Sequence, residues 1–92
     1  MAAFIGLLRK EKNSDFGVDF PDFPGCATAG RTLGEARRMA TEALAFHIEG
    51  MLADGQEIPP PSSLETVMAD RRNRGAVAVL VAQRGRRRLR AT

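Results

Sequence analysis

The chain has 92 residues and a mass of 10.0 kDa, enough for one small domain and too little for a two-domain enzyme. Its composition, 43% hydrophobic and 27% charged, is typical of a globular protein, and its longest apolar run, residues 76–82, is too short to span a bilayer. A single cysteine excludes an intrachain disulfide, and no signal-peptide pattern opens the chain. These features predict a cytoplasmic protein.

The net charge of +3 is the difference between two unlike segments. Residues 1–70 contain six basic side chains and all eleven acidic ones, whereas residues 71–92 contain eight arginines and no acid. An acidic body suits a basic partner, and an arginine-rich end suits phosphate or an acidic surface. We therefore divide the chain into a domain over residues 1–82 and an arginine-rich tail over residues 83–92.

Strand patterns dominate the first thirty residues. Residues 3–8 are apolar, and a polar stretch, residues 9–15, separates them from a second strand in which apolar residues alternate with Gly17 and Asp19. Residues 21–25 contain two prolines and a glycine and predict a fixed surface loop with Phe23 as its hydrophobic anchor. A short third strand is expected around residues 26–29.

A long amphipathic helix is expected next. Thr32 and Glu35 have the spacing of a capping box, and Asp54-Gly55 followed by prolines at 59–61 predicts where the helix ends. At helical spacing, the outward side comprises Glu35, Arg38, Glu42, Ala45 and Glu49. The inward side comprises Leu33, Ala36, Ala40, Ala43, Leu44, His47, Ile48 and Met51.

The remaining elements complete an α+β fold. Residues 62–65 predict the cap of a short helix ending near Asp70, and residues 76–82 predict a last strand that is apolar on both faces. Such a strand must be central in its sheet or covered by another chain. We expect a βββααβ order with a mostly antiparallel sheet and both helices on one face. A homodimer or higher homo-oligomer would cover the other face, with an interface at Val77, Val79, Leu80 and Val81.

Three motifs in residues 21–36 occur in a characteristic order. Residues 21–26 are Pro-Asp-Phe-Pro-Gly-Cys, residues 28–30 are Thr-Ala-Gly, and residues 32–36 are Thr-Leu-Gly-Glu-Ala. This order resembles the HicB family of antitoxins, and the likeness extends over residues 3–82. The resemblance implies a partial ribonuclease H-like fold that binds and occludes a HicA-like toxin. HicA proteins are small, basic, mRNA-cleaving toxins with a double-stranded-RNA-binding fold.

The end of the sequence departs from the family pattern. HicB proteins commonly carry a DNA-reading module after the last strand, whereas residues 83–92 show neither helical periodicity nor a cap. The tail could bind nucleic acid, contact acidic groups of another subunit, or act as a solubilising end. The alternative function is therefore a nucleic-acid-binding transcriptional regulator that uses Arg84, Arg86, Arg87, Arg88 and Arg90.

The acidic residues have two interpretations. By themselves they form a solvated face, but an inhibitor of a basic ribonuclease gains from carboxylates and a hydrophobic anchor where RNA would bind. The resemblance favours the second interpretation. It predicts that the toxin-binding residues are Asp15, Asp19, Asp22, Phe23 and Glu35.

The sequence contains few residues that could form a catalytic or metal-binding site. Cys26 and His47 are the one possible nucleophile and base, without an evident orienting group, and they are too few to form a closed zinc site. Ribonuclease H chemistry requires several convergent carboxylates around two metal ions, which Asp15, Asp19 and Asp22 are not placed to supply. We therefore expect no catalytic residue, no metal and no cofactor.

Overall fold

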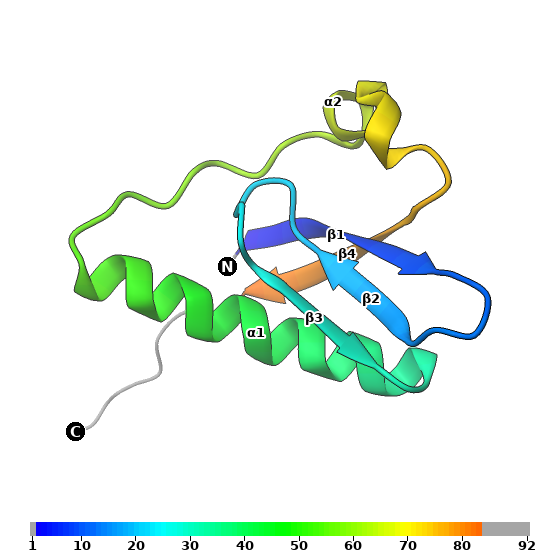
Figure 1. Ribbon diagram of the computed structural model, residues 1–92. Helices are drawn as coiled ribbons and strands as arrows, with labels where there is room; N and C mark the ends of the chain where they lie inside the picture. The colour runs from blue at the N-terminus through cyan, green and yellow to red at the C-terminus, as the bar shows by residue number, and fades with distance from the viewer. Residues whose placement is uncertain (1, 84–92) are drawn as a thin grey trace.

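Four antiparallel strands in the order β3-β2-β1-β4 form the sheet of the computed structural model, which describes residues 2–83 (Figure 1). The α+β class and the βββααβ order are confirmed. In chain order the elements are β1 (Ala2–Lys10), β2 (Phe16–Asp19), β3 (Ala27–Gly30), α1 (Leu33–Ala53), α2 (Leu64–Ala69), the 3-10 helix η1 (Arg71–Asn73) and β4 (Val77–Gln83).

The pleat of β1 divides its apolar residues between the two faces of the sheet. Phe4 and Leu8 pack on the side of α1, whereas Ile5 and Leu7 point to the opposite side, because alternate residues of a strand face opposite ways. β1 therefore needs cover on both faces. It lies between β2 and β4, with Leu7 opposite Asp19 in one ladder and opposite Ala78 in the other.

Both ends of α1 follow the predicted capping signals. Thr32 accepts a hydrogen bond at Oγ1 from the Glu35 amide at 3.0 Å, and the Glu35 carboxylate accepts one from the Arg31 amide at 2.6 Å. Asp54 is the C-cap and Gly55 follows with a positive φ of 76°, a conformation that favours glycine. The predicted limits of the helix are confirmed.

The main core lies between α1 and the sheet. A Cβ on Gly30 would lie 2.5 Å from the Ala36 nitrogen, so glycine lets the end of β3 meet the start of α1. Leu33, expected on the inward side of the helix, is instead 46% exposed. The buried residues of this core are Phe4, Val18, Phe20, Phe23, Cys26, Ala36, Ala40, Leu44, Ile48 and Val81.

The short helix α2 lies on the other face of the sheet, so the expectation that both helices share one face is wrong. Val67 of α2 packs with Ile5 and Leu7, the two β1 residues that point away from α1. The connector through the prolines at 59–61 carries the chain from the end of α1 to α2 (Figure 1). A smaller second core forms there because these β1 side chains would otherwise remain exposed to water.

β4 is an edge strand, which excludes the first of the two alternatives for this strand, a central position in the sheet. Within residues 2–83 it pairs only with β1. Val81 is buried in the main core, but Val77 is 59% exposed and Leu80 is 67% exposed. The remaining expectation, cover by another chain, stays open. No helix among residues 2–83 has the length and hydropathy to cross a membrane.

Replacement of Leu44 by Ala should lower the free energy of unfolding by about 2–5 kcal/mol, because its fully buried side chain lies in the middle of the inner face of α1. The matched control is Leu52→Ala on the same helix, where the leucine is 41% exposed. Chemical denaturation followed by circular dichroism measures both values. An equal loss in the two variants would show that the inner face of α1 is misassigned.

Candidate functional site

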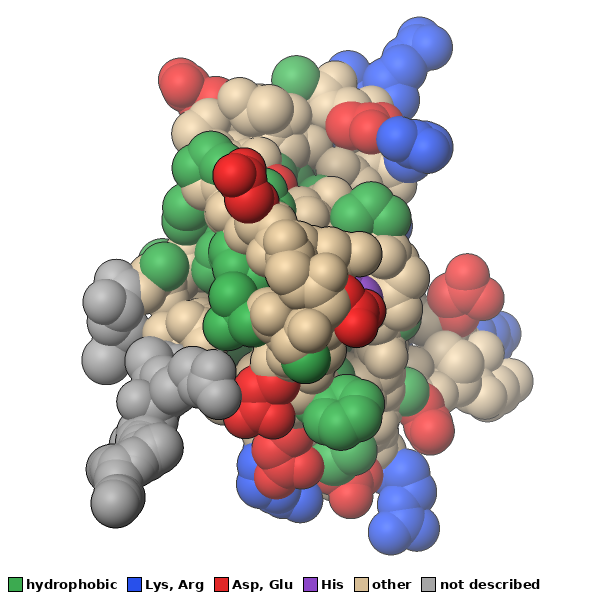
Figure 2. Space-filling view, turned by 90° about the vertical axis from the view of Figure 1, so that its left-hand side faces the viewer, with side chains coloured by type: hydrophobic (Ala, Val, Ile, Leu, Met, Phe, Trp, Pro, Cys, Tyr) green, Lys and Arg blue, Asp and Glu red, His purple; other side chains and the backbone are tan. Residues whose placement is uncertain are grey.

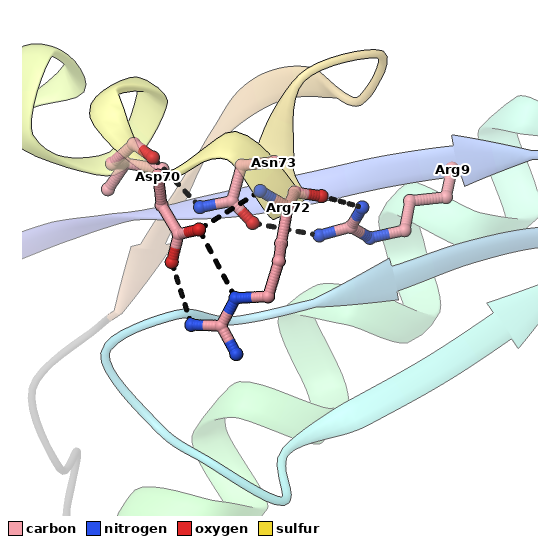
Figure 3. A network of polar contacts seen from close by, with 5 residues as sticks. Arg9, Asp70, Arg72 and Asn73 are labelled. Atoms are coloured by element: carbon pink, nitrogen blue, oxygen red, sulfur yellow. Dashed lines mark hydrogen bonds and ion pairs between the residues drawn. The ribbon is translucent and has the colours of Figure 1, made fainter.

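Asp19, a predicted toxin-binding residue, belongs to a polar network that joins β1 to η1. Its Oδ1 accepts from Arg9 Nε at 2.7 Å, and both side chains are about two-fifths exposed. Arg9 also donates to the Arg72 carbonyl at 3.1 Å and to Asn73 Oδ1 at 3.0 Å (Figure 3). Buried Asn73 in turn donates to the Val67 carbonyl at 2.8 Å, so the network fixes η1 against the sheet.

Three hydrogen bonds join the adjacent pair, Asp70 and Arg72, at the start of η1. Arg72 donates from its guanidinium to both carboxylate oxygens, at 2.7 and 3.2 Å, and from its amide at 3.0 Å. The side-chain hydrogen bond is the main reason why the pKa of Asp70 falls from 3.8 to about 2. Any stability from this pair is complete above pH 3.8 and is lost as the pH falls through about 2.

These groups line a cavity of about 440 Å³ between the loop after β2 and η1. Its charged side chains are Arg9, Asp19, Asp70 and Arg72, and each is paired with another member of the set. A charged ligand would have to break one of these pairs. The polar groups that line the cavity therefore connect η1 to the sheet, and the cavity is a poor candidate for a binding site.

The other predicted acidic residues are separated from one another. Asp22 binds Ser62 at the start of α2, accepting from the amide at 2.9 Å and from the hydroxyl at 2.5 Å. Glu35 caps α1, and Asp15 is exposed in the turn between β1 and β2. The structure thus does not bring the predicted residues together as one acidic face.

Phe23, predicted as the hydrophobic anchor of its loop and as a toxin-binding residue, is buried. Its side chain is 1% exposed, with its ring 4.8 Å from the ring of Phe4 and 5.7 Å from that of His47. Three backbone hydrogen bonds within residues 20–26 fold the loop so that this ring points inward. A loop residue therefore belongs to the core.

Cys26 and His47, the possible nucleophile and base, each make their contacts within the core. Burial raises the pKa of the Cys26 thiol, which disfavours the reactive thiolate, and the thiol faces the Ala43 carbonyl at 3.8 Å. The His47 ring makes an edge-to-face contact with Phe23. Among residues 2–83 no group of three or more His, Cys, Asp or Glu side chains could hold a metal ion.

The four residues predicted for the oligomer interface differ in their burial. Val77 and Leu80 are exposed on opposite faces of β4, Val79 packs partly on the main core, and Val81 is buried in that core. The arginines predicted to bind nucleic acid, Arg84, Arg86, Arg87, Arg88 and Arg90, lie outside the described residues.

A different exposed surface combines an aromatic ring with acidic side chains. Phe46 on α1 is 79% exposed, with Glu42 one turn before it and Glu49 one turn after it on the same side of the helix. We call Glu42, Phe46, Glu49, Gly50 and Asp54 the Phe46 surface. Figure 2 looks onto this end of α1, and its central part holds acidic and hydrophobic side chains, with Lys and Arg at the margins.

Sequence reasoning missed this surface, although a signal was present. Phe46 lies outside the inward set of α1 residues, and an aromatic residue off the apolar stripe of an amphipathic helix is a candidate for exposure. From residue 39 to residue 70 the sequence also contains six acidic residues and no Lys or Arg. The two observations together would have indicated an acidic surface with an exposed ring.

Comparison with known proteins identifies a family. Residues 4–85 match the model of the HicB-like antitoxins of bacterial toxin-antitoxin systems. An uncharacterized 14.9 kDa protein from the rep-hol intergenic region of Haemophilus phage HP1 is 51% identical over 53 residues, 58% of this chain and 40% of that protein. A UPF0150 protein of Synechocystis is 36% identical over 53 residues, 58% of this chain and 67% of that protein. The chain thus spans two-fifths of the phage relative.

Solved structures show the same fold. The antitoxin HicB of Burkholderia pseudomallei is 27% identical with a TM-score of 0.81, and the match covers 100% of this chain and 75% of that one. A chain of the HicA3 and HicB3 toxin-antitoxin complex is 29% identical with a TM-score of 0.73, and the match covers 89% of this chain and 98% of that one.

Replacement of Asp22 by Ala should destabilise the fold by about 1–3 kcal/mol, because it leaves the Ser62 amide and hydroxyl without their carboxylate partner. Asp15→Ala is the matched control, since Asp15 is exposed in a turn. Thermal and urea denaturation measure the difference. If both variants are as stable as the parent chain, Asp22 does not tether the loop to the start of α2.

Proposed function

Because this chain belongs to the HicB-like antitoxins of bacterial toxin-antitoxin systems, we propose that it neutralises a HicA-like toxin by binding and occluding its RNA-cleaving site. The observation that carries this proposal is the match to the HicA3 and HicB3 complex, which covers 98% of the matched chain. Occlusion needs no chemistry from the antitoxin, in agreement with the raised pKa of the Cys26 thiol. The expected compartment is the cytoplasm, where such a toxin meets messenger RNA.

Residues 1–82 are proposed to be sufficient for neutralisation. This proposal is supported by the fold, because both cores and all four strands lie within residues 2–83, before the arginines of the tail. Of the residues first proposed for toxin contact, exposed Asp15 remains available, whereas Asp19, Asp22 and Glu35 hold the fold and Phe23 is buried. Because the structure separates these carboxylates from one another, we assign Asp15, Asp19, Asp22 and Glu35 only a secondary part in toxin contact.

The toxin experiment uses the purified product of the neighbouring reading frame and a fluorescent RNA substrate. The full chain should abolish RNA cleavage at about one equivalent, and deletion of residues 84–92 should leave this inhibition unchanged. The deletion should remove any salt-dependent affinity for duplex DNA. Failure of the full chain to bind or inhibit the toxin would refute the proposal. Loss of inhibition on deletion would instead assign toxin binding to the tail.

A second copy of the chain is proposed to cover the edge of β4. The residues from Val77 to Gln83 include no charge and no proline, which are the usual means of protecting an edge strand from pairing. Exposed Val77 and Leu80 present apolar side chains on both faces of that edge. Strand pairing between two copies would bury both side chains and add a further ladder of backbone hydrogen bonds to the sheet.

Sedimentation velocity at tens of micromolar should therefore show at least a dimer for the full chain. Leu80→Lys should shift the population to monomer, because the exposed apolar side chain is replaced by a charge at the proposed contact. Glu65→Lys, exposed on α2, is the control for the change of charge. A monomeric parent chain, or a Leu80→Lys variant that remains dimeric, would refute this interface.

A further inference from the structure

We infer that the Phe46 surface is the part of the chain that contacts the toxin, and that it selects a basic partner. This inference rests on the proposed antitoxin function and assigns a surface to it. Phe46 is the most exposed of the large hydrophobic residues described, at 79%. An aromatic ring held on a rigid helix is the kind of side chain that dominates binding energy at protein interfaces.

A shallow recess beside Phe46 completes the apolar part of the surface. It measures about 290 Å³ and is lined by Phe46, His47, Gly50, Met51, Asp54 and Gln56. Gly50 is one turn after Phe46, and a Cβ at that position would meet no atom within 4 Å. A partner side chain therefore has room to lie against the ring, over His47 and Met51 at the edge of the core.

The charges around the recess specify the chemistry of that partner. Glu42, Glu49 and Asp54 are exposed, and none of the ion pairs within residues 2–83 involves them. A lysine or arginine of the partner could rest its apolar stem on Phe46 and reach one of these carboxylates. An acidic partner, including nucleic acid, would be repelled.

The acidic residues near the C-terminal end of α1 do not stabilise the helix itself, which points to a role in binding. The C-terminal end of an α-helix carries partial negative charge and is stabilised by basic residues. α1 has no basic residue in its last turn and has Asp54 as its C-cap, while Arg37 and Arg38 lie in its N-terminal half. The arrangement is unfavourable for the isolated helix, and a basic partner bound at this end would compensate it.

The test measures toxin binding by surface plasmon resonance with two altered chains. Phe46→Ser should weaken the affinity for the purified neighbouring toxin at least about tenfold, as expected for a central aromatic contact. The double variant Glu42→Lys with Glu49→Lys should mainly slow association, by about tenfold at low salt, and the difference should shrink as salt increases.

Matched controls separate a local effect from a general one. Leu33→Ser removes a 46%-exposed apolar side chain at the opposite end of α1, and Glu11→Lys with Glu65→Lys makes the same change in net charge at exposed sites elsewhere. Both controls should bind toxin like the parent chain. Circular dichroism should show the helix content of the parent chain in all variants, and thermal midpoints should change little, because no altered side chain is buried.

The outcomes distinguish this inference from the proposed function. If the parent chain binds toxin and the Phe46 and glutamate variants bind equally well, toxin contact lies elsewhere and only this inference is refuted. If the parent chain binds no toxin, both are refuted. If Phe46→Ser turns a dimeric chain into a monomer without changing toxin affinity, the surface joins two copies of this chain and the inference is wrong.

Discussion

The ring of Phe23 determines how the two layers of the molecule meet. It comes from a loop, yet it packs between Phe4 of the sheet and His47 of α1, with ring distances of 4.8 and 5.7 Å. Successive residues of a helix point in directions about 100° apart, so holding His47 inward turns its neighbour Phe46 away from the core. The buried ring and the exposed ring are therefore two results of one packing constraint.

Local signals predict most of the elements correctly. Alternation identifies the strands, and Thr32, Glu35 and Gly55 identify both ends of α1, because capping and turn chemistry depend on residues a few positions apart. The positions of α2 and β4 depend on contacts across the chain, such as the hydrogen bonds between Asp22 and Ser62, 40 residues apart. Periodicity within one segment carries no information about such partners. It therefore predicts the wrong face for α2 and leaves two alternatives for β4, of which the structure excludes the central position.

The candidate site shows the same limit at the level of side chains. The sequence supports the general idea of acidic groups beside an aromatic residue, and the structure contains that combination at Phe46, Glu42 and Glu49. The family resemblance instead predicts this combination at the loop around Phe23, where the ring is buried. Burial is a property of the assembled fold, and here the backbone hydrogen bonds of residues 20–26 direct the loop side chain inward.

The buried thiol of Cys26 provides a chemical probe for transient opening of the fold. The side chain is 4% exposed and lies under α1 beside the Ala43 carbonyl, and its raised pKa keeps it protonated. An alkylating reagent reaches it only when the structure around it opens, locally or by unfolding. Because the chain has no second cysteine, the rate of labelling relative to that of a free thiol measures the population of open forms, provided that closing is faster than labelling.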